Sequence, residues 1–160
     1  MTSFKTRGLI VVPADEGEAR WIDTSRITVK VAAAHTNGAY GLVVSEAARG
    51  ASSPMHVHRT AEEGIWVLSG RLLVRCGEEE FTLGPGSYTS LPRGVPHTYL
   101  AEEDTTMLGL VTPGGTEGFF VEAGPVATTS TPPAPDFERL QRAAEKYEVE
   151  LVGPPIAPRT

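Results

Sequence analysis

Two short stretches hold three of the chain's four histidines, and imidazole is a common ligand of transition metals. His56 and His58 lie in "HVHRTAEEG", and His97 follows in "LPRGVPHTYL". Because residues two apart on a β-strand point to the same face, the first two can aim both rings at one ion. A strand after the next turn can return a carboxylate to that point. Strand parity places Glu62 and Glu63 on opposite faces and does not choose between them.

Three neutral imidazoles and one carboxylate leave one or two positions open on an ion that prefers five or six ligands. Water, a substrate oxygen or O2 can then enter, which predicts a reactive site rather than a structural one. The ligand set suits divalent Fe, Ni, Mn, Cu or Zn, and relative affinity does not select among them. A His-x-His on a strand is only moderately specific, but the rigid Pro-x-Gly turn before His97 strengthens the metal interpretation.

The elements that position these residues are predicted to be strands of one all-β domain. A chain of 160 residues is long enough for a single core. Runs of β-branched and aromatic residues, interrupted by Gly, Pro, Asn or Glu, predict antiparallel strands, and closure into a barrel or jelly roll removes exposed sheet edges. The predicted strands are residues 9–12, 19–22, 27–33, 39–45, 55–58, 64–68, 72–76, 80–83, 87–91, 97–101, 106–111 and 119–121.

The chain divides by composition near residue 123. Residues 1–123 are predicted to form the barrel, with the two histidine-bearing stretches at 50–70 and 86–101. Residues 124–160 are predicted to be a Pro/Thr-rich connector and a C-terminal helix packed on the barrel.

That helix is predicted near residues 136–147, with Asp136 as its N-cap, and the closing "LVGPPIAPRT" is predicted to be irregular. Its apolar stripe is predicted from four residues at helical spacing: Phe137, Leu140, Ala144 and Tyr147.

Composition excludes several classes. The single Cys76 excludes an internal disulfide and is predicted to be a core residue. The only apolar run near the N-terminus is too short for a signal peptide, and no segment approaches a membrane span, which predicts a reduced, cytoplasmic setting without a membrane partner. A net charge of −6 without a Lys/Arg cluster argues against a nucleic-acid partner.

The two stretches resemble the two motifs of the cupin superfamily. "GASSPMHVHRTAEEGIWVLSG" is similar to G-x5-H-x-H-x4-E-x6-G, with Gly50, His56, His58, Glu63 and Gly70 in register. "GSYTSLPRGVPH" is similar to G-x5-P-x-G-x2-H, with Gly86, Pro92, Gly94 and His97. Ala101 stands where the family usually has Asn, a position that is not a ligand.

The resemblance implies a cupin jelly-roll barrel with one divalent metal, and the family spacing selects Glu63 over Glu62. The implied metal ligands are His56, His58, Glu63 and His97. Over residues 27–155 the chain looks like bacterial single-domain relatives of quercetin dioxygenase. In such dioxygenases the metal holds a substrate enolate while O2 attacks and the ligand glutamate acts as base, which implies that Glu63 is catalytic.

Other polar and apolar candidates have simpler interpretations. His35 lies beside a predicted turn outside both motifs and is expected to be a surface residue. A small-molecule site usually needs an apolar wall, and the candidate substrate-binding residues are Ile65, Val67, Tyr99 and Met107.

Three functions are compatible with these residues. The first is a metal-dependent, quercetinase-like dioxygenase that acts on a small enolisable aromatic or flavonol-like compound with O2. The second is a metal-dependent cyclase or isomerase of polyketide-type biosynthesis, and the third is a non-catalytic small-molecule-binding cupin. A homodimer is expected, because a partner can cover exposed sheet edges and cupins commonly pair.

Overall fold

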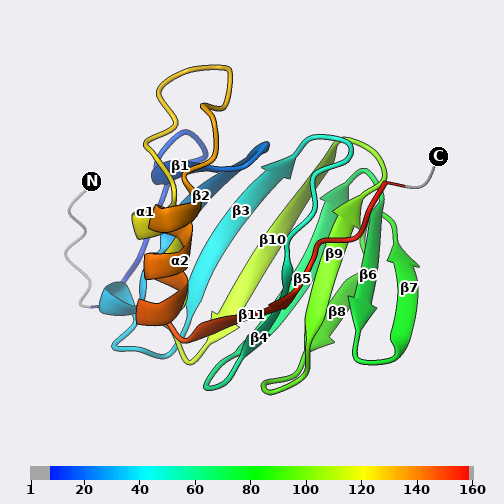
Figure 1. Ribbon diagram of the computed structural model, residues 1–160. Helices are drawn as coiled ribbons and strands as arrows, with labels where there is room; N and C mark the ends of the chain where they lie inside the picture. The colour runs from blue at the N-terminus through cyan, green and yellow to red at the C-terminus, as the bar shows by residue number, and fades with distance from the viewer. Residues whose placement is uncertain (1–7, 159–160) are drawn as a thin grey trace.

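Two antiparallel sheets pack face to face in the computed structural model, which describes residues 8–158 (Figure 1). The six-stranded sheet has the order β1-β2-β3-β10-β5-β8, and the five-stranded sheet has the order β11-β4-β9-β6-β7. This architecture confirms the predicted all-β fold. The strands are β1 (Glu18–Ile22), β2 (Ser25–Val31), β3 (Gly41–Ala47), β4 (Met55–His58), β5 (Glu62–Ser69), β6 (Leu72–Cys76), β7 (Glu79–Leu83), β8 (Tyr88–Leu91), β9 (His97–Ala101), β10 (Thr105–Thr112) and β11 (Val149–Gly153).

Alternation along the strands sends one set of side chains between the sheets. In β10 every second residue from Thr105 to Val111 is buried, as expected for a strand with one face on the core. The main core cluster includes Val67, Leu72 and Val74, which have no exposed surface. Other members of the cluster, Ile65 and Met107, line a cavity inside the barrel, and Val74 lines it too.

The pairing of β4 with β9 brings distant parts of the sequence together. Their one paired position sets His56 opposite His97 across the ladder. On its other side β9 pairs with β6 along its whole length. This pairing fixes the backbone of His97 within the sheet. The β6–β7 hairpin turns through Gly77, whose φ of 58° is unfavourable for residues with a side chain.

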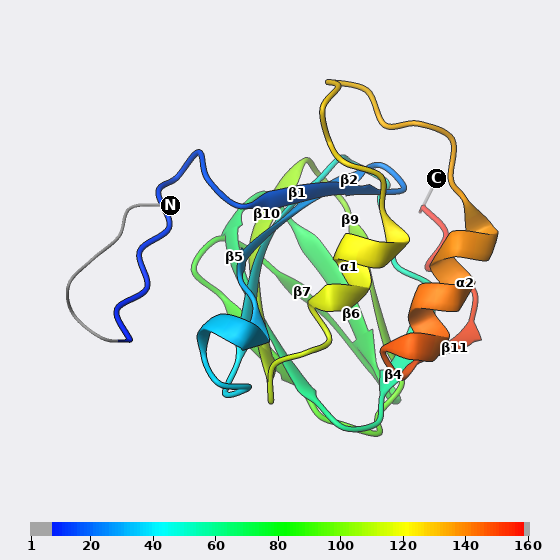
Figure 2. The same cartoon turned by 90° about the vertical axis from the view of Figure 1, so that its left-hand side faces the viewer.

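Two helices lie beside the cavity end of the barrel (Figure 2). Helix α1 (Gly118–Ala123) packs against α2 (Phe137–Lys146) and contacts β1 and β2. The predicted N-cap of α2 is present, because an Asp136 carboxylate oxygen accepts a hydrogen bond from the backbone N–H of Arg139 at 2.9 Å. Within residues 8–158, neither helix is long and apolar enough to cross a membrane.

Three secondary-structure predictions are wrong. Residues 9–12 form no strand, and residues 119–121 lie in α1, because Phe119 and Ala123 are one helical turn apart and both pack on α2. The predicted irregular end begins inside a strand, since residues 151–153 belong to β11, which pairs with the free edge of β4.

The apolar stripe of α2 also differs from the prediction. Phe137, the first residue of the helix, is 75% exposed. Leu140, Ala144 and Tyr147 do pack inward, and they are joined by Ala143.

Candidate metal centre

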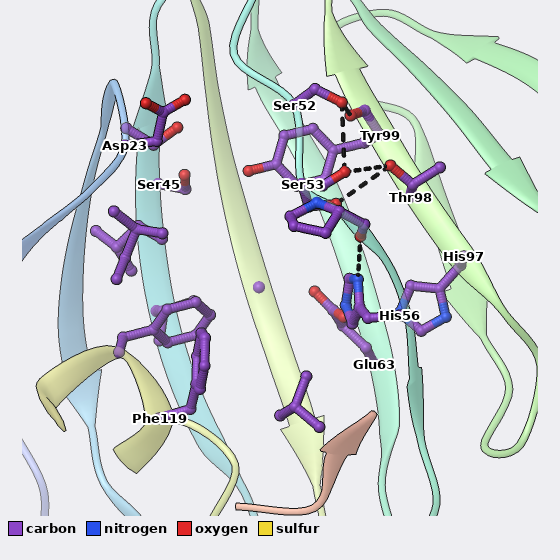
Figure 3. Close-up of a pocket in the computed structure, with 18 of the residues that line it drawn as sticks. Asp23, Ser45, Ser52, Ser53, His56, Glu63, His97, Thr98, Tyr99 and Phe119 are labelled. Carbon is purple, nitrogen blue, oxygen red and sulfur yellow. Dashed lines mark hydrogen bonds and ion pairs between the residues drawn. The ribbon is translucent and has the colours of Figure 1, made fainter. Parts of the chain in front are cut away.

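Four side chains from three strands converge on one point. His56 and His58 come from β4, Glu63 from the start of β5, and His97 from the start of β9. One candidate ligand atom from each lies within 4.8 Å of all the others. Figure 3 shows His56, Glu63 and His97 grouped at one side of the cavity. This group has the composition and spacing of a site that could hold a metal ion.

Backbone carbonyls fix the orientation of two of the rings. Nδ1–H of His56 donates to the Pro54 carbonyl oxygen at 2.8 Å, and Nδ1–H of His97 donates to the Val95 carbonyl oxygen at 2.9 Å. A carbonyl can only accept, so in the neutral rings Nδ1 carries the proton and Nε2 keeps a free lone pair. Both residues therefore present Nε2 as a ligand atom.

Two buried ring nitrogens in this group are left without a hydrogen bond: His97 Nε2 and His58 Nδ1. Glu63 Oε2 lies 3.4 Å from His97 Nε2, but the pair lacks hydrogen-bond geometry. A buried unsatisfied polar atom costs free energy and calls for an explanation. A bound cation would satisfy the lone pair of His97, so the donor set fits a divalent metal.

The charges within the group also suit metal binding. Burial by itself would raise the pKa of Glu63, but the hydrogen bond with His58 and the close approach of both His58 and His97 outweigh burial and lower it. Burial, with the neighbouring His97, lowers the pKa of His56 to about 4. Burial would also lower the pKa of His97, but the Glu63 carboxylate outweighs it and raises that pKa. At neutral pH the site thus offers an ionised carboxylate and a neutral His56.

The register of β5 separates the two adjacent glutamates. Glu63 pairs with Val111 of β10 and Leu91 of β8, both buried, and its side chain points inward. Glu62 points outward, with Oε1 3.6 Å from Nε of Arg93, and its side chain is 46% exposed. Only Glu63 belongs to the convergent group.

Comparison with known proteins places the fold and the site in a family. The family model described as "Cupin domain" matches residues 43–113, which contain all four convergent residues. These residues of the chain form a cupin domain. Among curated relatives, this cupin is 32% identical over 93 residues to quercetin 2,3-dioxygenase of Bacillus subtilis (strain 168), and 35% identical over 82 residues to quercetin 2,3-dioxygenase of Aspergillus japonicus.

These alignments cover 58% and 48% of this cupin but only 28% and 23% of the two dioxygenases. The chain thus spans about a quarter of the length of the curated relatives it matches. Among solved structures, KdgF from Halomonas sp. has a TM-score of 0.61 at 20% identity, covering 67% of this cupin and 97% of that chain. An RmlC-like cupin from Shewanella frigidimarina has a TM-score of 0.58 at 17% identity, covering 66% and 91%. These likenesses support the jelly-roll fold.

The convergent group of this cupin opens onto a largely apolar cavity of about 430 Å³, a size suited to a small organic molecule. Of the predicted substrate-binding residues, Ile65, Tyr99 and Met107 line the cavity. Val67 instead lies in the closed core with 0% exposure, two residues deeper along β5. His35 stands apart as the exposed last residue of a short 3-10 helix (Ala33–His35), where its Nδ1 accepts a hydrogen bond from the backbone N–H of Ala32.

Two polar cavity residues, Ser25 and Ser45, were not anticipated from the sequence. Ser25 and Ser45 occupy buried positions in strands whose other inward residues are apolar. A polar residue at an inward position of an alternating strand is the signal that identifies them. Tyr99 lies near both serines, and burial raises the pKa of its hydroxyl to about 12, so it stays protonated at neutral pH.

Proposed function

We propose that this cupin holds one divalent transition metal on His56, His58, Glu63 and His97, and acts as a metal-dependent oxygenase. The substrate proposed is a small enolisable aromatic compound of flavonol-like shape. The similarity to two quercetin 2,3-dioxygenases supports this reaction class. The observation that carries the proposal is the convergence of three imidazoles and one carboxylate, with a buried unbonded Nε2 on His97, at the wall of an apolar cavity.

The protein groups would divide the work as follows. When bound, a divalent metal would supply Lewis-acid stabilisation of an anionic substrate oxygen and an open position for O2. Glu63 would accept the proton of the enolisable hydroxyl at a carboxylate oxygen, since its lowered pKa keeps it ionised at neutral pH. The carbonyls of Pro54 and Val95 would hold the rings of His56 and His97 in place.

The cavity wall would orient the substrate and exclude water. Ile65 and Met107 line the cavity onto which the convergent group opens, and Phe119 lines it from α1. Their apolar surfaces match a flat aromatic body and lower the local dielectric, which strengthens the electrostatic interactions of the ionised groups. Helix α1 therefore contributes to the proposed binding site as well as to packing.

Oxygen consumption tests this function. The purified protein is analysed for bound metals, reconstituted with Fe, Ni, Mn, Cu or Zn, and mixed with quercetin in an oxygen electrode. The proposal predicts metal-dependent O2 uptake coupled to loss of the flavonol, and no loss under anaerobic conditions. If the zinc-loaded protein converts a polyketide-type substrate without O2, the cyclase or isomerase would be favoured. Binding without turnover in every metal form would favour a non-catalytic cupin.

We also propose a homodimer formed through the outer face of the six-stranded sheet. Trp66, Leu68 and Tyr88 lie there on β5 and the edge strand β8, and each is about half exposed. A second copy could cover this apolar surface and the strand edge in an isologous contact. Sedimentation equilibrium at micromolar concentration is expected to give twice the chain mass, and a mass of one chain would refute the pairing.

A further inference from the structure

The cavity has a second polar region, distinct from the convergent group of His56, His58, Glu63 and His97. Asp23, Ser25, Ser45 and Tyr99 all line it. Asp23 follows β1 in the turn to β2, and the other three belong to β2, β3 and β9. Figure 3 shows the Tyr99 hydroxyl directed toward Ser45 and Asp23, on the far side of the cavity from His97. We call these four residues the distal cluster.

The distal cluster contains a polar atom whose burial is unexplained. Ser45 is only 5% exposed, and its Oγ is buried without a hydrogen bond of normal geometry, although the Tyr99 hydroxyl lies near it. Ser25 is 4% exposed at the start of β2. Leaving a buried hydroxyl unpaired costs free energy that an apolar residue of similar size would avoid. A ligand group that bonds to Ser45 would remove this cost.

The charges of the cluster select the kind of ligand group. Hydroxyls of Ser25, Ser45 and Tyr99 can accept or donate, whereas the Asp23 carboxylate only accepts and carries a negative charge. A carboxylate or phosphate would be repelled there. A group that donates hydrogen bonds would be favoured, whether it is a neutral phenolic hydroxyl or an ammonium.

We propose that the distal cluster is a subsite for a hydrogen-bond-donating group at the end of the ligand remote from the metal group. Apolar residues make up much of the remaining cavity wall, among them Ile27, Val43 and Met107. The ligand is thus an elongated, mainly apolar molecule with a donor group at its distal end. Only the placement of its other end at the metal rests on the proposed function.

Small aromatic probes test the subsite directly in the full-length protein. Phenol, benzylammonium, benzoate and toluene are titrated while backbone amide shifts are followed by ¹H–¹⁵N NMR, with the protein as isolated and after chelation. Phenol or benzylammonium should shift the amides of Ser25, Ser45 and Tyr99 and bind more tightly than toluene, whereas benzoate should bind there more weakly than toluene. Equal binding of all four probes, or no shift at these amides with any probe, would overturn the proposal.

Conservative variants of the cluster show which kind of donor group on the ligand it recognises. Ser45→Ala and Tyr99→Phe should each weaken phenol binding by about 3- to 10-fold, the usual effect of one neutral hydrogen bond. Asp23→Asn should weaken benzylammonium binding by about 2- to 5-fold, because Asp23 is exposed and solvent screens its charge, and should change phenol binding little. If the variants weaken only phenol binding, the donor group of the ligand is a phenolic hydroxyl. If they weaken only benzylammonium binding, it is an amine.

The matched controls are exposed residues outside the cavity lining and outside the proposed dimer face: Ser130→Ala, Tyr40→Phe and Asp15→Asn. If the cluster variants bind every probe as the controls do, the subsite is wrong. These measurements need neither O2 nor turnover. Probe binding at the cluster without O2 uptake would reject the oxygenase alone, and O2 uptake without donor-selective binding would reject the subsite alone.

Discussion

Glu63→Gln keeps the size of the side chain but removes its charge and its capacity to accept a proton. The carboxylate lies 3.2 Å from His58 Nε2 and 3.4 Å from His97 Nε2, so it is central to the group. Loss of a general base lowers a rate by about 10² to 10⁴, which corresponds to about 3 to 5 kcal/mol in activation free energy. The three imidazoles remain, so turnover should fall far more than metal occupancy.

Glu62→Gln is the matched control on the adjacent residue. Its side chain is 46% exposed and pairs with Arg93 across 3.6 Å, an interaction worth about 0 to 1 kcal/mol at a surface. The same chemical change there should leave turnover and metal content almost unchanged.

The assay compares metal content and single-turnover rate for both variants with a flavonol under air. A crippled Glu62→Gln with an active Glu63→Gln would mean that the register of β5 is wrong by one residue. If both variants turn over normally, the site works without a carboxylate base, and the oxygenase mechanism loses its main chemical support.

Three further predictions concern stability. Gly70 and Gly86 both have φ of 84°, but a Cβ on Gly70 would collide with the backbone oxygen of Asp104, whereas Gly86 faces open space. In urea unfolding, Gly86→Ala should lower the free energy of unfolding by about 1 to 2 kcal/mol, and Gly70→Ala should lower it clearly more. The folded pKa of His56 is about 4 against about 6.5 unfolded, so as the pH falls through this window the unfolded chain takes up the proton first and stability is lost. The chelated wild type should therefore lose about 2 kcal/mol more than His56→Gln between pH 7 and pH 5, and equal losses would show that His56 is not held neutral. Asp136→Ala removes the α2 cap and should lower the free energy of unfolding by about 1 kcal/mol, while an unchanged denaturation midpoint would contradict that role.

The strands around the convergent group were the most predictable part of the fold. The predicted strands 55–58, 72–76 and 97–101 match β4, β6 and β9 residue for residue. Each combines β-branched or aromatic residues with a turn signal at its boundary, so local sequence suffices. The Glu62–Glu63 choice needed more than parity, because parity does not say which face of β5 lies inward.

The elements that were wrongly predicted depend on tertiary contacts. Phe119 and Phe120 have the composition of a strand, but packing of α1 against α2 makes the segment helical. Residues 149–153 become a strand because β4 offers them an open edge, which no local pattern reveals. Val67 shares the inward face of β5 with Ile65, but its depth in the barrel, and not its parity, keeps it out of the cavity.

Anomalous diffraction at a metal absorption edge tests the central claim most directly. Crystals of the protein reconstituted with the metal that supports highest occupancy would be measured above and below that metal's edge. The account predicts one anomalous peak within coordination distance of His56, His58, Glu63 and His97. A peak at another position, or metal-loaded crystals with no peak between these four residues, would contradict it.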